Sequence, residues 1–254
     1  MNKLIVQIYE IQEPFEAELM IDAGVDHIGG VILSENNIKD EQLKASVKLI
    51  KDSDSLSSLI PLYSNPESIY RTLDYYEPDI IHFCESLSNE NGILPICYKL
   101  IDMQKELKAR YPKIKIMRSI PIAETKMVSR VPTLEIAAFF ESVSDFFLTD
   151  TLLIKENGPG NEQPVEGFVG ITGITCDWEM AGKLVEQSKI PVVFAGGLSP
   201  ENVFNGAITI RPAGVDSCTQ TNLRDENNKP IRFKKDIEKV KRFVSETRRA
   251  EKNS

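Results

Sequence analysis

The sequence predicts a single α/β domain, a (β/α)8 TIM barrel spanning residues 1–248. Short apolar runs alternate with longer amphipathic runs along the whole chain, which is typical of a parallel sheet wound with helices. The alternation repeats eight times in 254 residues, a length at which α/β barrels form one domain. An open, doubly wound sheet of eight units is the alternative architecture.

The elements follow one another in regular order. Strands are expected near residues 3–9, 27–33, 58–63, 79–84, 114–120, 145–150, 191–195 and 214–218. Helices are expected near residues 14–23, 40–51, 66–77, 94–110, 125–142, 177–188, 200–209 and 232–247. The third helix illustrates the signal, because Pro66 begins it, Ile69, Leu73 and Tyr76 recur at helical spacing, and Pro78 ends it.

Two segments depart from this regularity. Residues 151–176 follow the sixth strand and are rich in Gly, Pro and Asn. Loops of this length inside a compact domain are usually functional, and in a barrel a loop after a strand lies on the active-site face. The segment 151–169 is therefore a candidate lid. Residues 249–254 are expected to form a frayed, charged tail.

Composition excludes several classes of function. The net charge of −8 argues against a surface for nucleic acid or anionic membranes. The four cysteines are scattered without a Cys-x-x-Cys pair, so neither a zinc site nor a disulfide framework is indicated. The first residues do not resemble a signal peptide, and no run approaches 18 apolar residues. We expect a cytoplasmic protein, monomeric or homodimeric, without a metal ion or cofactor.

A glycine pair marks the end of the seventh predicted strand. Gly196 and Gly197 allow a sharp turn and the close approach of a ligand to main-chain N–H groups. The helix that follows directs its unpaired N–H groups toward this turn, so a phosphate is a suitable ligand. The alternative is a plain turn in which Ser199 caps the helix and Pro200 begins it.

Polar side chains gather at the carboxyl ends of the predicted strands, which share one mouth in a barrel. Burial at the end of an apolar strand would raise the pKa of Asp150 toward that of a general acid, or the residue caps a loop. His82 faces away from its neighbours and is either a core histidine or an acid/base catalyst. Arg118 could clamp an anion or pair with Asp150 or Asp216. Asp216 could bind sugar hydroxyls or serve as a cap.

Four motifs in the second half resemble those of the phosphoribosylanthranilate isomerase family, in the same order. They are FFLTDT at 146–151, GITGITCDW at 170–178, AGGLSPENV at 195–203 and RPAGVDSCTQ at 211–220. The first half resembles the family more weakly, through residues 23–33 and 77–85. The resemblance covers most of the chain.

The resemblance implies an Amadori rearrangement of a small phosphorylated sugar within tryptophan biosynthesis. A general acid protonates the ribose ring oxygen, the ring opens to a Schiff base, and a general base removes the C2 proton. Asp150 falls on the family's general acid. The implied phosphate site comprises Gly196, Gly197, Cys218 and Thr219. The candidates for binding the rest of the substrate are Arg118, Gly173 and Asp216.

The chain also departs from the family pattern. Tyr9 stands where the family has its catalytic cysteine, and Glu10 replaces the glycine that follows. The substrate-carboxylate arginine after the second strand is missing, and Gln220 replaces a phosphate-loop glycine. Tyr9, Glu10 and His82 are the candidate substitute bases. The other hypotheses are an enzyme for another sugar phosphate and a catalytically silent barrel that binds a phosphate metabolite.

Overall fold

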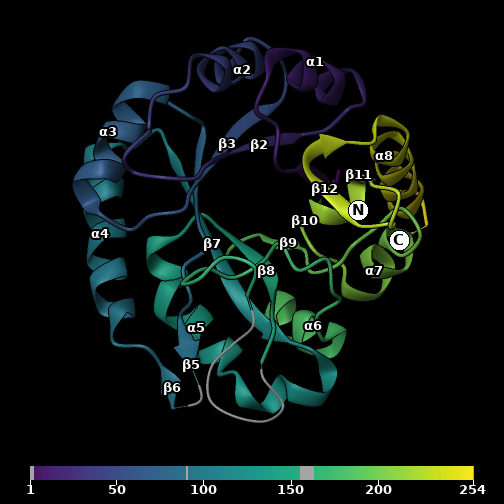
Figure 1. The fold of residues 1–254 in the computed structure, drawn as a ribbon. Coiled ribbons are helices and arrows are strands. Elements are labelled where there is room, and N and C mark those ends of the chain that lie inside the picture. Colours follow the sequence, from purple (N-terminus) through teal and green to yellow (C-terminus); the bar gives the residue numbers. More distant parts are fainter. Residues whose placement is uncertain (1–2, 90, 155–162, 254) are drawn as a thin grey trace.

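The computed structural model describes residues 3–89, 91–154 and 163–253. Eight parallel strands close into a barrel in the order β1–β10–β9–β8–β7–β4–β3–β2 (Figure 1). They are β1 (Ile5–Ile8), β2 (His27–Ile32), β3 (Leu56–Pro61), β4 (Ile80–Phe83), β7 (Lys115–Ala123), β8 (Phe146–Leu152), β9 (Val192–Phe194) and β10 (Gly214–Ser217). The predicted barrel and its eight strands are confirmed, and the open sheet is excluded.

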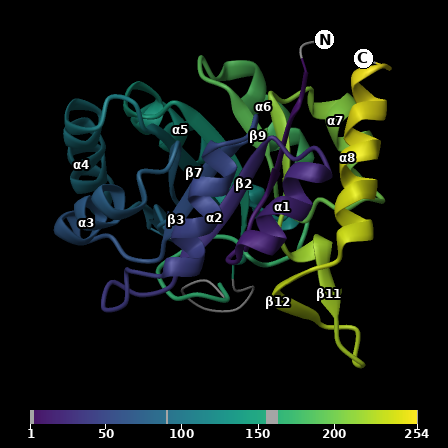
Figure 2. The ribbon, with the colours of Figure 1, turned by 90° about the horizontal axis from the view of Figure 1, so that it is seen from above.

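The helices form a ring outside the strands (Figures 1 and 2). They are α1 (Pro14–Asp22), α2 (Glu41–Lys51), α3 (Pro66–Tyr76), α4 (Ile96–Arg110), α5 (Thr133–Phe140), α6 (Trp178–Gln187), α7 (Val203–Ile210) and α8 (Ile237–Glu251). Side-chain caps fix several starts: Asn65 accepts a hydrogen bond from Ser68 N, and Asp177 accepts one from Met180 N.

Two predicted helices differ in the structure. The segment predicted as one helix over 125–142 is divided into a 3-10 helix, η1 (Thr125–Arg130), then α5, then a second short 3-10 turn, η2 (Glu141–Val143). Pro132 explains the division, because a proline forces the residue before it, Val131, into extended backbone. The helix predicted at 200–209 begins only at Val203, after a turn over 200–202.

The C-terminal region also differs from expectation. The predicted helix at 232–247 begins at Ile237, where Asp236 caps it. The residues before it form β12 (Pro230–Lys235), which pairs with β11 (Asn222–Arg224) in an antiparallel hairpin. At its other end α8 continues to Glu251, into the segment predicted to be a frayed tail. A second small hairpin, β5 (Ser88–Asn89) and β6 (Gly92–Ile93), follows β4.

Side chains fill both sides of the barrel wall. The larger apolar cluster lies between the strands and the helices. A smaller one, which includes Ile80, Met117, Leu148 and Val193, fills the barrel interior. Because side chains alternate along a strand, the residues of each strand divide between these two layers.

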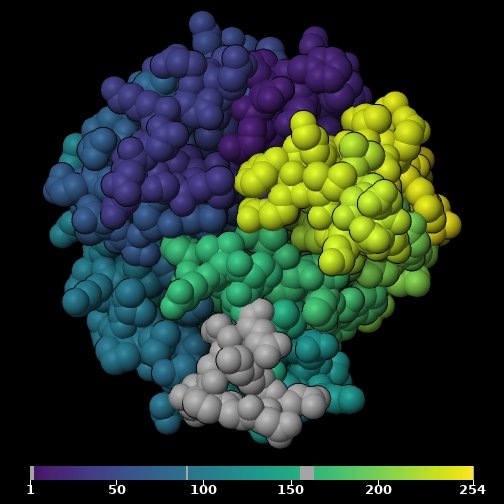
Figure 3. All heavy atoms as spheres, in the orientation of Figure 1, coloured from purple at the N-terminus to yellow at the C-terminus, as the bar shows by residue number. Residues whose placement is uncertain are grey.

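Two segments meet over the centre of the face that holds the carboxyl ends of the strands. In the space-filling view, residues 163–176 (green) and the β11–β12 region (yellow) lie next to each other there (Figure 3). The side-chain amide of Gln220 joins them by donating to Gly173 O at 2.7 Å. The mouth of the barrel is thus partly covered from two sides.

Within the described residues, no helix is both long enough and apolar enough to cross a membrane. The same part of the chain holds no group of three or more His, Cys, Asp or Glu side chains placed to bind a metal ion.

Candidate active site

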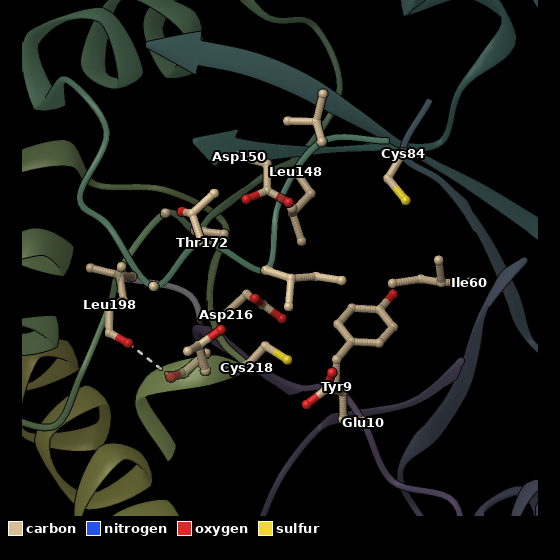
Figure 4. A pocket seen from close by; sticks show the side chains of 18 of the residues that line it. Tyr9, Glu10, Ile60, Cys84, Leu148, Asp150, Thr172, Leu198, Asp216 and Cys218 are labelled. Carbon is tan, nitrogen blue, oxygen red and sulfur yellow. Dashed lines mark hydrogen bonds between the residues drawn. The ribbon is translucent and has the colours of Figure 1, made fainter. Parts of the chain in front are cut away.

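A pocket opens at the carboxyl ends of the strands and encloses about 700 Å³ of empty space, including its mouth. Ten of the predicted site residues line it. They are Tyr9, Glu10, His82, Asp150, Gly173, Gly196, Gly197, Asp216, Cys218 and Thr219. Figure 4 shows the carboxyl groups of Asp150 and Asp216 near the middle of this pocket, with Tyr9 on one side and Leu198 on the other.

Asp150 lies near the end of β8 and is half-buried. Burial raises its pKa to about 7, and the nearby charge of Asp216 adds to the rise. Its Oδ1 accepts a hydrogen bond from Thr151 N at 2.9 Å. Gly170 packs against the carboxyl group so closely that a Cβ there would lie 2.1 Å from Asp150 Oδ2. The loop after β8 therefore shields this carboxyl group from water.

Asp216, on β10, is held by a chain of polar side chains inside the barrel. Gln7 Nε2 donates to its Oδ1 at 3.1 Å, and Gln7 Oε1 faces His27 Nδ1 at 3.1 Å. Since Gln7 Oε1 can only accept, His27 must donate from Nδ1, and this fixes which end of the amide faces Asp216. Burial raises the pKa of Asp216 to about 7, although the Gln7 hydrogen bond and Lys235 oppose the rise.

The two carboxyl groups have different surroundings. Asp216 accepts a side-chain hydrogen bond and lies in the field of Lys235, both of which favour its ionised form. Within the described residues Asp150 accepts a hydrogen bond from Thr151 N, and the Asp216 charge disfavours its ionisation. One negative charge shared between two such groups settles on Asp216. Near neutral pH these surroundings favour ionisation of Asp216 over ionisation of Asp150.

Tyr9 and His82 belong to a buried hydrogen-bonded chain. Tyr9 Oη lies 2.6 Å from Ser58 Oγ and 2.7 Å from His82 Nδ1, and His82 Nε2 lies 2.9 Å from Ser119 Oγ. Burial raises the pKa of Tyr9 well above its usual range. Burial and the charge of Arg118 lower the pKa of His82 to about 3. Both groups therefore stay neutral.

Glu10 follows β1 with a positive φ of 65°, the backbone region that favours glycine. Its carboxylate accepts hydrogen bonds from Arg232 Nε at 2.6 Å and from Asn222 Nδ2 at 3.2 Å. Burial opposes ionisation, but Lys235 and Arg232 outweigh it, and the pKa of Glu10 is lowered. Glu10 is thus an ionised group that fastens the β11–β12 hairpin to the barrel.

The prediction that Arg118 binds substrate is not supported, because Arg118 does not line the pocket. Its guanidinium pairs with Glu85 and Gln104 and lies over the rings of Phe83 and Phe140. It also does not pair with either aspartate of the pocket. The strand register gives the reason: Arg118 is opposite Phe83, whereas Met117 is opposite His82 and faces the interior. The alternation that predicts His82 to point inward also places Arg118 outward.

The glycine pair after β9 is required by packing as well as by backbone shape. Gly196 and Gly197 have φ values of 93° and 65°. A Cβ on Gly197 would lie 2.6 Å from Thr175 N, and one on Gly196 would lie 2.7 Å from Thr151 Oγ1. The loop after β8 thus rests directly on this turn. The expectation that Ser199 caps α7 is wrong, because Asn202 is the residue before the helix and makes no capping hydrogen bond.

The loop after β10 receives a cation from the hairpin that sequence analysis did not predict. Lys235 Nζ donates to Cys218 O at 2.9 Å. In a trans peptide the C=O and N–H groups point in opposite directions, so this contact directs Thr219 N–H to the other side. Thr219 lines the pocket, and Lys235 places a positive charge behind this loop.

Sequence analysis missed the residues that support the site from behind. Gln7, Ser58 and Ser119 contact Asp216, Tyr9 and His82 inside the barrel. Their strand positions carry the signal, since a polar residue at an inward position of a barrel strand needs a partner there. Lys235 carried no comparable signal because its segment has a helical appearance in the sequence.

Comparisons with known proteins show what the whole chain resembles. No protein-family model matches the chain. The chain is 27% identical to N-(5′-phosphoribosyl)anthranilate isomerase 2 of Methanosarcina mazei, over 94% of this chain and 92% of the relative. It is 25% identical to N-(5′-phosphoribosyl)anthranilate isomerase of Methanosarcina acetivorans, over 97% of this chain and 94% of the relative.

Solved structures show the same fold. Phosphoribosylanthranilate isomerase from Thermotoga maritima superimposes with a TM-score of 0.67 at 19% identity, covering 96% of this chain and 98% of that one. A second structure, of phosphoribosylanthranilate isomerase in complex with reduced 1-(o-carboxyphenylamino)-1-deoxyribulose 5-phosphate, gives a TM-score of 0.65 at 18% identity over the same shares. The chain is thus similar to phosphoribosylanthranilate isomerases over nearly its full length and shares their barrel fold.

Proposed function

We propose that the protein catalyses an Amadori-type isomerisation of an N-(5-phosphoribosyl) amine, with Asp150 as general acid and Asp216 as general base. One observation carries the proposal: two carboxyl groups whose pKa values both lie at about 7 face one pocket. At neutral pH such a pair can donate one proton and accept another, which an aldose–ketose isomerisation requires.

The reaction begins at the ribose ring. Asp150 donates its proton to the ring oxygen, the C1–O bond breaks with its electron pair moving to that oxygen, and the nitrogen lone pair forms a C1=N bond. Asp216 then takes the proton from C2. The electron pair of this C–H bond forms a C1=C2 bond, and the C=N pair returns to nitrogen. The enol finally ketonises, its hydroxyl losing a proton and C1 gaining one, so that the product is an isomer of the substrate.

Asp216 suits the role of base better than the three candidates from the sequence. Tyr9 is neutral because its pKa is raised, and His82 is a very weak base because its pKa is about 3. Glu10 is ionised, but its carboxylate is already occupied by Arg232 and Asn222. Burial raises the pKa of the pocket thiols Cys84 and Cys218, so neither supplies a thiolate.

The turns after β9 and β10 support a phosphate subsite. Gly196 and Gly197 line the pocket at the turn after β9, and Lys235 Nζ is bonded to Cys218 O behind the turn after β10. Backbone donors with a nearby positive charge are a common phosphate-binding arrangement. The reacting carbons of a phosphopentose held here would lie toward the two aspartates at the centre of the pocket.

The test is turnover of N-(5-phosphoribosyl)anthranilate, monitored by fluorescence, with the purified protein and its Asp150→Asn and Asp216→Asn variants. Each variant is expected to reduce kcat at least a hundredfold, which is the usual contribution of a general acid or base. Asp102→Asn is the matched control, because Asp102 is exposed on α4 and outside the pocket.

Other outcomes separate the rival hypotheses. If Asp216→Asn keeps full activity while Asp150→Asn loses it, the base is another residue and the proposed assignment is wrong. If the protein turns over neither this substrate nor other N-phosphoribosyl amines, yet phosphate esters raise its Tm, a barrel that only binds a phosphate metabolite is the better description.

A further inference from the structure

The pocket has two chemically different ends. Figure 4 shows Leu198 and Thr172 on one side, Tyr9 and Ile60 on the other, and the two aspartates between them. The first side belongs to the glycine turn and the loops after β8 and β10. The second side belongs to β1 to β4.

Part of the side formed by β1 to β4 is apolar. Val31 on β2, Ile60 on β3 and Leu62 just after β3 line it, together with the ring of Tyr9. The hydroxyl group of Tyr9 does not change this character, because Ser58 and His82 already occupy it at 2.6 and 2.7 Å. We call the surface of Val31, Ile60, Leu62 and Tyr9 the apolar wall.

Charge in the pocket is negative. Among the described residues that line it, three are acidic, Glu10, Asp150 and Asp216, and none is Lys or Arg. The cations of β12 stand behind the lining. Arg232 is paired with Glu10, and Lys235 is bonded to Cys218 O and Asn222 Oδ1. Neither side chain lines the pocket, so the surface of the apolar wall itself carries no positive charge.

We infer that the apolar wall holds the amine substituent of the substrate and that this substituent is an uncharged aryl or alkyl group. The inference rests on the proposed function and names its substrate class. An anthranilate carboxylate against this wall would lose its hydration without gaining a cation, and it would share the pocket with an ionised aspartate. Burial of an unpaired charge is strongly unfavourable, whereas burial of an unsubstituted ring is favourable.

The direct test compares two unreactive ligands that differ by one carboxyl group. They are reduced 1-(o-carboxyphenylamino)-1-deoxyribulose 5-phosphate and its counterpart with a plain phenylamino group. Isothermal titration calorimetry at pH 7.5 is expected to give a Kd at least tenfold lower for the phenylamino compound, equivalent to about 1.4 kcal/mol. Equal affinity, tighter binding of the carboxylated compound, or binding of neither overturns the inference.

A cation placed on the wall should reverse the preference. Leu62 is partly exposed at the pocket mouth, so a long polar side chain can replace it without entering the core. Leu62→Arg is expected to improve the affinity for the carboxylated ligand at least tenfold, and Leu62→Gln, the matched uncharged control, is expected not to. Thermal unfolding establishes that both variants fold. The wild-type comparison stands if Leu62→Arg does not fold, and an unchanged preference in a folded Leu62→Arg contradicts the inference.

Turnover separates this inference from the proposed function. With N-(5-phosphoribosyl)aniline and N-(5-phosphoribosyl)anthranilate as substrates, kcat/KM is expected to be at least tenfold higher for the aniline compound. If the protein turns over both compounds and prefers the anthranilate compound, the inferred substrate class is wrong and the proposed reaction still stands. Tight binding of the phenylamino ligand without turnover of either substrate contradicts the proposed reaction and supports the binding preference.

Discussion

The ring of Tyr9 occupies the space that a side chain at residue 29 would need. A Cβ built on Gly29 would lie 2.0 Å from Tyr9 Cδ1. Gly29 is a buried residue of β2, and its φ is not in the left-handed region, so its missing side chain matters for space rather than for backbone freedom. The large side chain at the end of β1 is therefore accommodated by the absence of one on the neighbouring strand.

Gly29→Ala tests this relationship. The added methyl group is expected to push the Tyr9 ring out of place and to destabilise the protein by about 1–3 kcal/mol, the usual cost of overpacking a core. Gly182→Ala on α6 is the control, because a Cβ there would lie 3.8 Å from Ile210 Cδ1, which is an ordinary van der Waals contact. Urea unfolding of both variants measures the difference. Equal stability would show that the ring moves aside at no cost.

Arg118 is expected to act in stability and not in binding. Arg118→Met leaves Glu85 buried without its cation, which typically costs about 3–5 kcal/mol. The KM of the folded variant is expected to stay unchanged, since Arg118 does not line the pocket. Arg110→Met removes an exposed ion pair with Asp74 and should change stability by less than about 1 kcal/mol. A stable Arg118→Met variant with a raised KM would contradict this assignment.

Gln7→Leu is expected to raise the pKa of Asp216, because it removes a hydrogen bond that favours the ionised form. A base must be deprotonated to act, so the acid limb of the pH–rate profile should move to higher pH. A hydrogen bond worth about 1 kcal/mol corresponds to somewhat less than one pH unit. Carbon-13 NMR titration of the labelled aspartate carboxyl groups measures the same shift without substrate, and an unmoved titration would contradict the role of Gln7.

Asp150→Asn is expected to stabilise the protein at alkaline pH. An unfolded chain releases the Asp150 proton near pH 4, whereas the folded protein retains it until about pH 7. The contribution of this group to stability therefore falls as the pH rises from 4 to 7 and remains low above 7. Asparagine removes this loss, so the variant should melt several degrees higher than the wild type at pH 8. At pH 4 the two Tm values should be close, and an equal difference at both pH values would contradict the raised pKa.

Lys235→Met is expected to weaken phosphate binding. Loss of the cation behind Cys218 O removes the charge that supports Thr219 N–H, and inorganic phosphate should inhibit the variant at least tenfold less strongly. Lys234→Met is the matched control, since Lys234 is the exposed neighbour on the same strand. If both variants bind phosphate as the wild type does, the turn after β10 is not supported by Lys235.

The sequence by itself determined the barrel and most of the rim. Period-two alternation and regular helix signals predict the eight strands because local patterning controls where each element lies. Once the strands are known, parallel pairing brings their carboxyl ends together, so Asp150, Asp216 and the glycine pair reach one pocket without further information. The hairpin at 222–235 was missed because the helical pattern of α8 extends backward over Arg232 and Lys235.

Only the tertiary structure decided which rim residue can do which chemistry. The roles of Tyr9, Glu10 and His82 depend on partners from distant segments, Ser58, Arg232 and Ser119 among them. Burial and partner charge set each pKa, and neither is a property of the local sequence. Arg118 is equally plausible as a ligand or a structural residue until the register turns it toward Glu85. Long-range packing thus assigns the roles among residues that the sequence can only place.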